Sequence, residues 1–229
     1  MKKHFYLLLL FLFTAVLSRA QQLSQVSFTG GGSSVNYFSV QTEQGVHLRI
    51  SEDGSLVEWG MEVRAMQGDF YAPKLQPFQG GIIYYGVEGD SISKGRIKMI
   101  GACTITYYGP FESETHIGKV KSIGRVYFDY YTQYDNKDVR GKIKTIGTMK
   151  LEYFNSFENE AYRGKLRAIG GTALTYYSNF DDRNNSGKIK SIGPAKYIWY
   201  SAMDRRDAGG GLKVGNYRQM VNGITFIMW

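Results

Sequence analysis

The feature that most constrains this chain is a seven-residue stretch that occurs five times at a fixed spacing. It reads glycine, base, aliphatic residue, base, any residue, isoleucine, glycine. The leading glycines lie 23 residues apart without insertion or deletion, at Gly95, Gly118, Gly141, Gly164 and Gly187. A fixed period of this length is typical of repeat architectures, in which one supersecondary unit stacks on copies of itself. We therefore expect stacked units over residues 95–209, with a degenerate unit before them that contains Tyr84-Tyr85.

Each unit is predicted to be a β-hairpin. With the leading glycine as position zero, positions one and three are basic and position two is aliphatic, the alternation of a strand with one buried face. A second run follows the glycine at position six, with apolar residues at positions ten, twelve, thirteen and sixteen. We expect a three-residue turn at positions six to eight, because a two-residue turn would place a lysine opposite the apolar position ten. On that register the isoleucine at position five falls on the basic face unless a bulge at Gly101 and its equivalents turns it inward.

The fold class predicted from this pattern is all-β, an antiparallel meander of about twelve to sixteen strands that forms an open elongated sheet or a barrel-like one. No window has apolar residues at sustained helical spacing, so little helix is expected. Residues 21–80 are predicted to form an N-terminal β-hairpin region, with 21–34 as a flexible lead-in, and residues 81–229 the β-hairpin repeat domain. A final strand is expected near the C-terminus, over 224–229.

The first twenty residues have the pattern of a secretory signal peptide. Lys2 and Lys3 precede a 13-residue apolar run, which is too short to span a membrane, and Ser18-Arg19-Ala20 is a small-x-small cleavage site. The alternative is an uncleaved anchor. The protein is therefore expected to be exported, to the periplasm, the cell surface or the extracellular space. Cys103 is the sole cysteine, so no intramolecular disulfide can form, and we expect it to be a packed side chain.

The most distinctive predicted surface is a regular array of bases with aromatic rings beside it. Equivalent positions in successive units are two strands apart, or roughly 9–10 Å. The candidate binding face consists of the bases Arg96, Lys98, Lys119, Lys121, Lys142, Lys144, Lys165, Arg167, Lys188 and Lys190, with Tyr108, Tyr131, Tyr177 and Tyr200. Such an array suits a linear polyanion, so the expected partner is an anionic glycan or another component of the cell envelope. The alternative is a solvated face balanced by two carboxylates in each connecting loop, and this even balance of charge favours the structural interpretation.

Net charge and residue composition give little support for nucleic-acid binding, catalysis or metal binding. Removal of residues 1–20 leaves 25 basic and 20 acidic side chains, a balance of +5, which is weak support for a polyanion partner. Nucleic acid fits the charge but not the expected compartment, so none is expected. His47 and His116 are the histidines that follow the signal, no serine or cysteine has a recognisable nucleophile context, and bases intrude among the loop acids. We expect no catalytic residues, no metal and no cofactor.

The 23-residue period, the Gly-Lys strand and the run Tyr107-Tyr108-Gly109-Pro110-Phe111 resemble MORN-type hairpin repeats. The resemblance covers about residues 84–209, and the other clear units lack the glycine found at Gly109. It implies hairpins stacked into an elongated sheet that serves as a scaffold for proteins or lipids, and it transfers no binding residues.

Three functions are consistent with these observations. The first is an exported, non-enzymatic structural or binding module of the cell envelope, which the signal and the rigid period favour. The second is an outer-membrane β-barrel, suggested by the meander and the aromatic C-terminus, although the strands are short and the outward face is charged. The third is a secreted polysaccharide-active enzyme with paired carboxylates, although the periodic placement of the acids points to a structural role.

Overall fold

The computed structural model describes residues 22–63, 74–204 and 210–229, and these contain strands and turns but no helix. The all-β prediction is therefore confirmed. The expected signal peptide, residues 1–20, lies outside the described residues. Within the described part of the chain, no helix has the length and apolar character needed to cross a membrane.

The repeat units form one open antiparallel sheet of eleven strands, in which neighbours in sequence are neighbours in space. Its strands are β6 (Ile82–Tyr84), β7 (Ile97–Ile100), β8 (Cys103–Tyr107), β9 (Val120–Ile123), β10 (Val126–Tyr130), β11 (Ile143–Ile146), β12 (Met149–Tyr153), β13 (Leu166–Ile169), β14 (Thr172–Tyr176), β15 (Ile189–Ile192) and β16 (Ala195–Lys196). A two-stranded ladder, β17 (Ile198–Trp199) and β18 (Leu212–Val214), continues the series.

A second open sheet of seven strands joins the two ends of the described chain, in the order β19-β20-β1-β2-β3-β4-β5. Its strands are β1 (Gln22–Thr29), β2 (Ser34–Gln41), β3 (Val46–Ile50), β4 (Leu56–Glu62), β5 (Leu75–Gln76), β19 (Arg218–Val221) and β20 (Ile224–Met228). Strand β20 confirms the predicted final strand, and it pairs with β1 in parallel. The described residues thus contain twenty strands, more than the twelve to sixteen expected.

The predicted flexible lead-in over residues 21–34 was wrong, because β1 is a strand inside the seven-stranded sheet. Its apolar side chains, among them Val26 and Phe28, face the core, and polar side chains such as Gln25 and Ser27 face the other way but are buried too. The polar residues of this segment therefore cover a sheet face that is packed, and they do not mark a loop.

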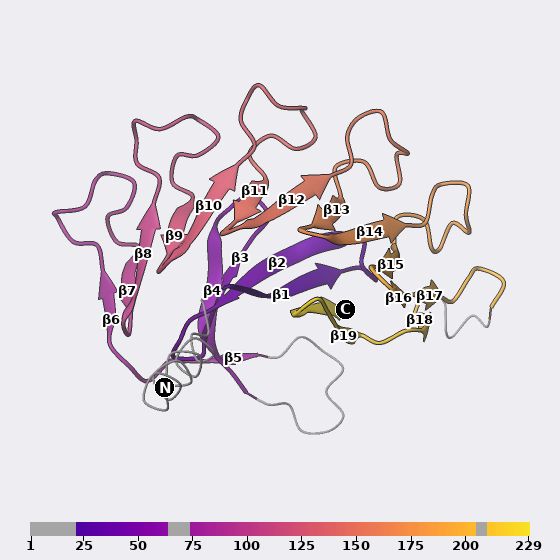
Figure 1. Cartoon of the computed structure of the whole chain (residues 1–229), viewed down its shortest axis with the longest axis horizontal. Coiled ribbons are helices and arrows are strands. Elements are labelled where there is room, and N and C mark those ends of the chain that lie inside the picture. Colours follow the sequence, from indigo (N-terminus) through magenta and orange to yellow (C-terminus); the bar gives the residue numbers. More distant parts are fainter. Residues whose placement is uncertain (1–21, 64–73, 205–209) are drawn as a thin grey trace, which may run out of the picture.

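The repeat hairpins form an arc around the seven-stranded sheet, with the connecting loops on the outside of the arc (Figure 1). Apolar residues of the two sheets belong to one buried cluster, with Phe28, Phe38 and Leu48 on one side and Phe128 and Leu151 on the other. The core is therefore the space between the curved repeat sheet and the sheet it surrounds.

The predicted three-residue turn was wrong: position five pairs with position eight, which leaves a two-residue turn at positions six and seven. In the third unit, Ile146 pairs with Met149 across Gly147, whose φ is +58°. A positive φ at the first of two turn residues matches a type II′ turn, which glycine adopts without steric cost.

A one-residue bulge at position three explains why this register keeps the core apolar. Tyr130 pairs with Ile143 and Asp129 with Thr145, so Lys144 is the extra residue on its strand. The bulge places positions two and five on the same face, and Ile143 and Ile146 are both buried. The same shift recurs between the other successive units.

The turn between β3 and β4 fastens the inner sheet to the repeat sheet. The Glu52 carbonyl oxygen accepts a hydrogen bond of 3.0 Å from the Ile143 amide, and that of Gly54 accepts one of 3.0 Å from Val120. A Cβ on Gly54 would lie 2.3 Å from the Tyr130 ring, so glycine is required for this close approach.

Candidate functional site

The predicted basic face separates into two rows with different surroundings. The inner base row consists of the position-one residues Arg96, Lys119, Lys142, Lys165 and Lys188. Each lies 4.8–5.5 Å from the centroid of the position-twelve ring of its own unit. Each also donates a hydrogen bond to the carbonyl oxygen of the glycine 22 residues later, for example Lys165 Nζ to Gly187 at 2.6 Å. The inner base row thus connects each unit to the next.

Burial lowers the pKa of three lysines of the inner base row, Lys119, Lys165 and Lys188. Burial lowers the pKa of Lys165 to about 8. It also lowers the pKa of Lys119, against the opposing effect of the Asp53 carboxylate. Because these ammonium groups are partly desolvated and already hydrogen-bonded, they are poorly placed to hold an external anion.

The outer base row consists of the position-three residues Lys98, Lys121, Lys144, Arg167 and Lys190. Each lies 5.1–5.7 Å from the centroid of the position-thirteen ring of the preceding unit. Lys121 also pairs with Glu112 at 3.4 Å, and Lys98 pairs with Glu88 at 3.4 Å. The outer bases therefore cover aromatic rings, and Lys98 and Lys121 are also partly neutralised by loop carboxylates.

The predicted tyrosines are bonded within the sheet as well. The hydroxyls of Tyr108, Tyr131 and Tyr177 donate to position-ten carbonyl oxygens of the next unit at 2.8–3.0 Å. Tyr200 lies beneath Lys213, 5.4 Å from its Nζ. Every residue of the predicted binding face thus has an intramolecular partner.

A different row of side chains lies on the connecting loops and is almost fully exposed. We call it the tip row. It consists of the position-sixteen residues Phe111, Tyr134, Phe157, Phe180 and Met203, which are 90–100% exposed. The sequence shows that this position is apolar in every clear unit, but a periodic apolar position is usually part of a core. Its exposure depends on how the loop folds.

The loops hold the tip row in a defined place. In each unit the amide of position seventeen donates to the carbonyl oxygen of position fourteen, at 3.1–3.4 Å, which closes a β-turn with the tip residue in its third position. In the Tyr134 loop the Asp135 carboxylate also accepts from the Thr132 amide at 2.7 Å. The same contact recurs at Asp181 and Asp204.

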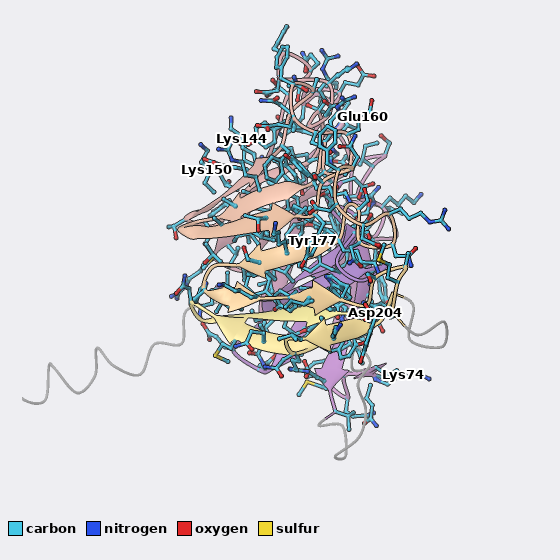
Figure 2. The ribbon with its side chains drawn as sticks, turned by 90° about the vertical axis from the view of Figure 1, so that its right-hand side faces the viewer. Lys74, Lys144, Lys150, Glu160, Tyr177 and Asp204 are labelled. Atoms are coloured by element: carbon cyan, nitrogen blue, oxygen red, sulfur yellow. The ribbon has the colours of Figure 1, made fainter. Side chains whose placement is uncertain are left out.

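Neighbouring loops are also bonded to each other. Asn159 Nδ2 donates to Asn179 Oδ1 at 2.5 Å, and the Asp182 carboxylate accepts from the Ala202 amide at 3.1 Å. Figure 2 shows Glu160 and Asp204, from two of these loops, at one end of the hairpins, and Lys150, beside a turn, at the opposite end. The loops that carry Phe157, Phe180 and Met203 are therefore joined into one edge.

A polar cavity of about 450 Å³ lies where the inner sheet meets the repeat sheet. Its lining includes Ser34, Glu52, Lys142, Lys165 and Tyr176. Burial raises the pKa of Glu52 although Lys142 Nζ lies 2.9 Å away. Lys142 also donates a hydrogen bond to the Gly164 carbonyl oxygen of the next unit, and Glu52 belongs to the turn that joins the two sheets. Both groups therefore stabilise the contact between the sheets.

Two hydroxyl–histidine–carboxylate sets occur among the residues that the structure describes. Ser39 Oγ is 3.1 Å from His47 Nδ1, and His47 Nε2 is 3.8 Å from Glu62 Oε2, but Ser39 is 0% exposed and no substrate reaches it. Burial lowers the pKa of His47, which keeps its ring neutral near pH 7.

The second set is Ser113, His116 and Asp129, with distances of 2.6 Å and 3.1 Å to the ring nitrogens. His116 is buried and packs edge-on against Tyr108 and Tyr130. Val139 and Asn185 are buried at the same position of other units, so His116 fills a place that needs no catalytic group.

Among the residues that the structure describes, no group of three or more histidine, cysteine, aspartate or glutamate side chains is arranged to hold a metal ion. Cys103 is buried and forms no disulfide, and burial raises the pKa of its thiol, which agrees with the packed side chain expected from its strand position.

Comparison of the chain with models of known families, with characterised proteins and with solved structures gives no match in any of the three. The resemblance to MORN-type repeats therefore stays a prediction, and function has to be inferred from the geometry of the residues.

Proposed function

We propose that this chain is an exported, non-enzymatic binding module of the cell envelope, and that the tip row is its contact surface. The observation that carries the proposal is the full exposure of one apolar side chain in each of five successive loops. A side chain that is at least 90% exposed buries almost no surface and so adds little to the stability of the fold. Apolar residues repeated at such a place are typical of an interaction surface.

The construction of the loops supports the same conclusion. Turn hydrogen bonds and loop-to-loop bonds fix the tips before any partner arrives. A preorganised surface loses less conformational entropy on binding than a mobile one, so more of the contact energy appears as affinity. The repeat sheet thus holds one exposed apolar side chain per unit at a regular spacing, where a partner can contact it.

The test compares two versions of the protein that begins at Gln21. One is unaltered and the other carries Y134S, F157S and F180S. Each is incubated with washed envelopes from the source cell, and the bound fraction is measured after sedimentation. We expect the unaltered protein to sediment with envelopes and the triple variant to remain in solution. Equal sedimentation of the two would refute the role of the tip row.

A second candidate, an anionic glycan along the outer base row, is favoured by the partial exposure of that row. The side chains of Lys98 and Lys121 are 38% and 43% exposed even in their ion pairs. Binding to polygalacturonate that weakens steeply with added salt and is lost in K121Q/K144Q/K190Q would support it. Retention that is insensitive to salt would exclude it.

A further inference from the structure

The proposed function leaves the chemistry of the partner open, and the tip row carries an inference about it. Successive tips are at least two strand spacings apart, roughly 9–10 Å, because the loops lie on the outer side of the arc (Figure 1). At this spacing the rings do not touch one another. The row is thus a series of separate apolar contacts and not one continuous hydrophobic patch.

Separate contacts at equal intervals suit a partner with the same kind of repeat. A protein interface is built around a contiguous, fully desolvated cluster of large side chains, which this row does not provide. A polysaccharide offers the apolar face of a sugar ring again and again along an extended chain. Aromatic rings stack on such faces, and the stacking needs no contact between one aromatic ring and the next.

The charges beside the tips select among polysaccharides. The residue after each tip is acidic: Glu112, Asp135, Glu158, Asp181 and Asp204. Backbone hydrogen bonds lower the pKa of Asp135, and those from Ser201 help lower that of Asp204 to about 2, so these carboxylates are ionised at neutral pH. Glu112 is paired with Lys121 at 3.4 Å and Asp204 with Lys213 at 2.9 Å, so the charge beside the tips is negative or balanced. Such a row offers no net attraction to acidic glycans, nucleic acid or anionic lipid.

The same side chains are suited to sugar hydroxyls. The loop hydrogen bonds of Asp135 and Asp181 use Oδ2, which leaves Oδ1 of each ionised carboxylate as a strong acceptor for a hydroxyl donor. The side-chain amides of Asn159 and Asn179 lie between the third and fourth tips. Their Oδ1 atoms accept hydrogen bonds within the loops, and their Nδ2 groups add donors at the loop edge. Apolar rings flanked by such groups match a ligand with an apolar face and a polar rim.

We propose that the tip row binds an uncharged, extended polysaccharide, with successive rings stacking on sugar units along the chain. This proposal rests on the proposed function, since it assigns a ligand class to the same surface. This ligand differs from the anionic glycan considered for the outer base row. Binding assays with uncharged and with acidic polymers distinguish the two.

The experiment measures depletion of the protein from solution by insoluble β-1,4-linked glucan, by insoluble β-1,4-linked N-acetylglucosamine polymer and by cross-linked polygalacturonate. Vesicles of phosphatidylcholine with and without phosphatidylglycerol are tested in parallel, and the protein alone is examined by sedimentation velocity. We expect retention by at least one of the two uncharged polymers. The Y134S/F157S/F180S variant should lose at least about tenfold in affinity, since three stacking contacts disappear.

Tyr127→Ser is the matched control, because Tyr127 is an exposed aromatic residue at the turn end of a hairpin, away from the tip row. Its affinity should stay within about twofold of the unaltered protein. Thermal unfolding of each variant shows that a loss of binding is not a loss of fold.

Three results would overturn the inference: no retention by either uncharged polymer, binding to vesicles that the triple variant abolishes, or self-association that the triple variant abolishes. If the triple variant still loses its retention on cell envelopes, the proposed function stands and the ligand class alone is wrong. If envelope retention does not depend on the tip row, both fall.

Discussion

Substitution of Tyr130 by phenylalanine tests whether the inward rings hold the hairpins together by hydrogen bonding as well as by packing. Tyr130 is fully buried, and its hydroxyl donates to the Val120 carbonyl oxygen at 2.7 Å. The variant keeps the ring beneath Lys119, whose Nζ lies 4.8 Å from the ring centroid, and removes the donor alone. The same bond recurs at the position-twelve residue of the other clear units, so the result applies to the whole array.

The expected loss follows from leaving a buried acceptor without this donor, which costs about 1–3 kcal/mol. With a urea m-value of about 2 kcal/mol per molar, the unfolding midpoint should fall by about 0.5–1.5 M without a change in m. The assay is equilibrium unfolding in urea, followed by circular dichroism and by tryptophan fluorescence on the same samples.

Tyr131→Phe is the internal control for this experiment. Tyr131 is partly buried and donates to Leu151 at 2.9 Å, but the third unit already carries phenylalanine there, at Phe154. The Phe154 ring still lies beneath the outer base of the next unit, since Arg167 is 5.7 Å from its centroid. We expect Tyr131→Phe to cost less than about 1 kcal/mol. A Tyr130→Phe midpoint no lower than that of Tyr131→Phe would refute the reasoning.

Three further predictions follow from burial. Burial raises the pKa of Tyr107 and of Tyr197 to about 12, so the stability from their neutral rings is complete below pH 10 and is lost as the pH rises through 12. Absorbance of ionised phenol and circular dichroism should therefore change together in alkali for these rings, and full tyrosine ionisation with an intact sheet would contradict this. Gly54→Ala should destabilise by about 1–3 kcal/mol more than Gly45→Ala in the same urea assay. Both glycines have positive φ, but a Cβ at Gly54 meets the Tyr130 ring at 2.3 Å and one at Gly45 meets the flexible end of Met61 at 3.4 Å; equal losses would disprove the close approach. Cys103 should react with a thiol reagent only as the protein unfolds, since it is buried and its pKa is raised, and rapid labelling in native buffer would contradict its burial.

The sequence predicts the repeated hairpin but not its register. The period and the alternation around Lys142 and Ile143 specify strands with one buried face, and β11 and β12 confirm them. The turn length was wrong because a bulge at Lys144 shifts the pairing by one residue. A bulge that occurs in every unit does not change the 23-residue period, so the sequence does not reveal it. The face on which the isoleucine at position five lies can therefore be assigned only from the strand pairing.

The seven-stranded sheet was harder to predict because its contacts join distant parts of the chain. Strand β1 pairs with β20 across some 200 residues, for example at Gln25 and Thr225. Its polar residues are buried by their neighbours, so the local pattern of Gln25 and Ser27 resembles a loop.

The candidate site shows the same division between local and non-local information. The basic and aromatic positions were found by their regularity, and the structure gives each of them an intramolecular partner. The tip row was visible as an apolar position, but its exposure is set by the β-turn that ends at residues such as Asp135 and by the direction in which the loops project. Neither the β-turn nor the direction of the loops can be read from the 23-residue period.

The pairing of β20 with β1 has a consequence for the evolution of the gene. In an open solenoid, duplication of one repeat lengthens the protein and leaves both ends folded. In this chain the last hairpin has to return to β1, where Trp229 also bonds Ser27 at 2.8 Å. One added copy would carry that hairpin roughly 9–10 Å further along the arc and away from its partner strand. The width of the inner sheet therefore limits how many copies can surround it, and a chain with one copy more or fewer should lose the pairing of β20 with β1 even though each copy remains intact.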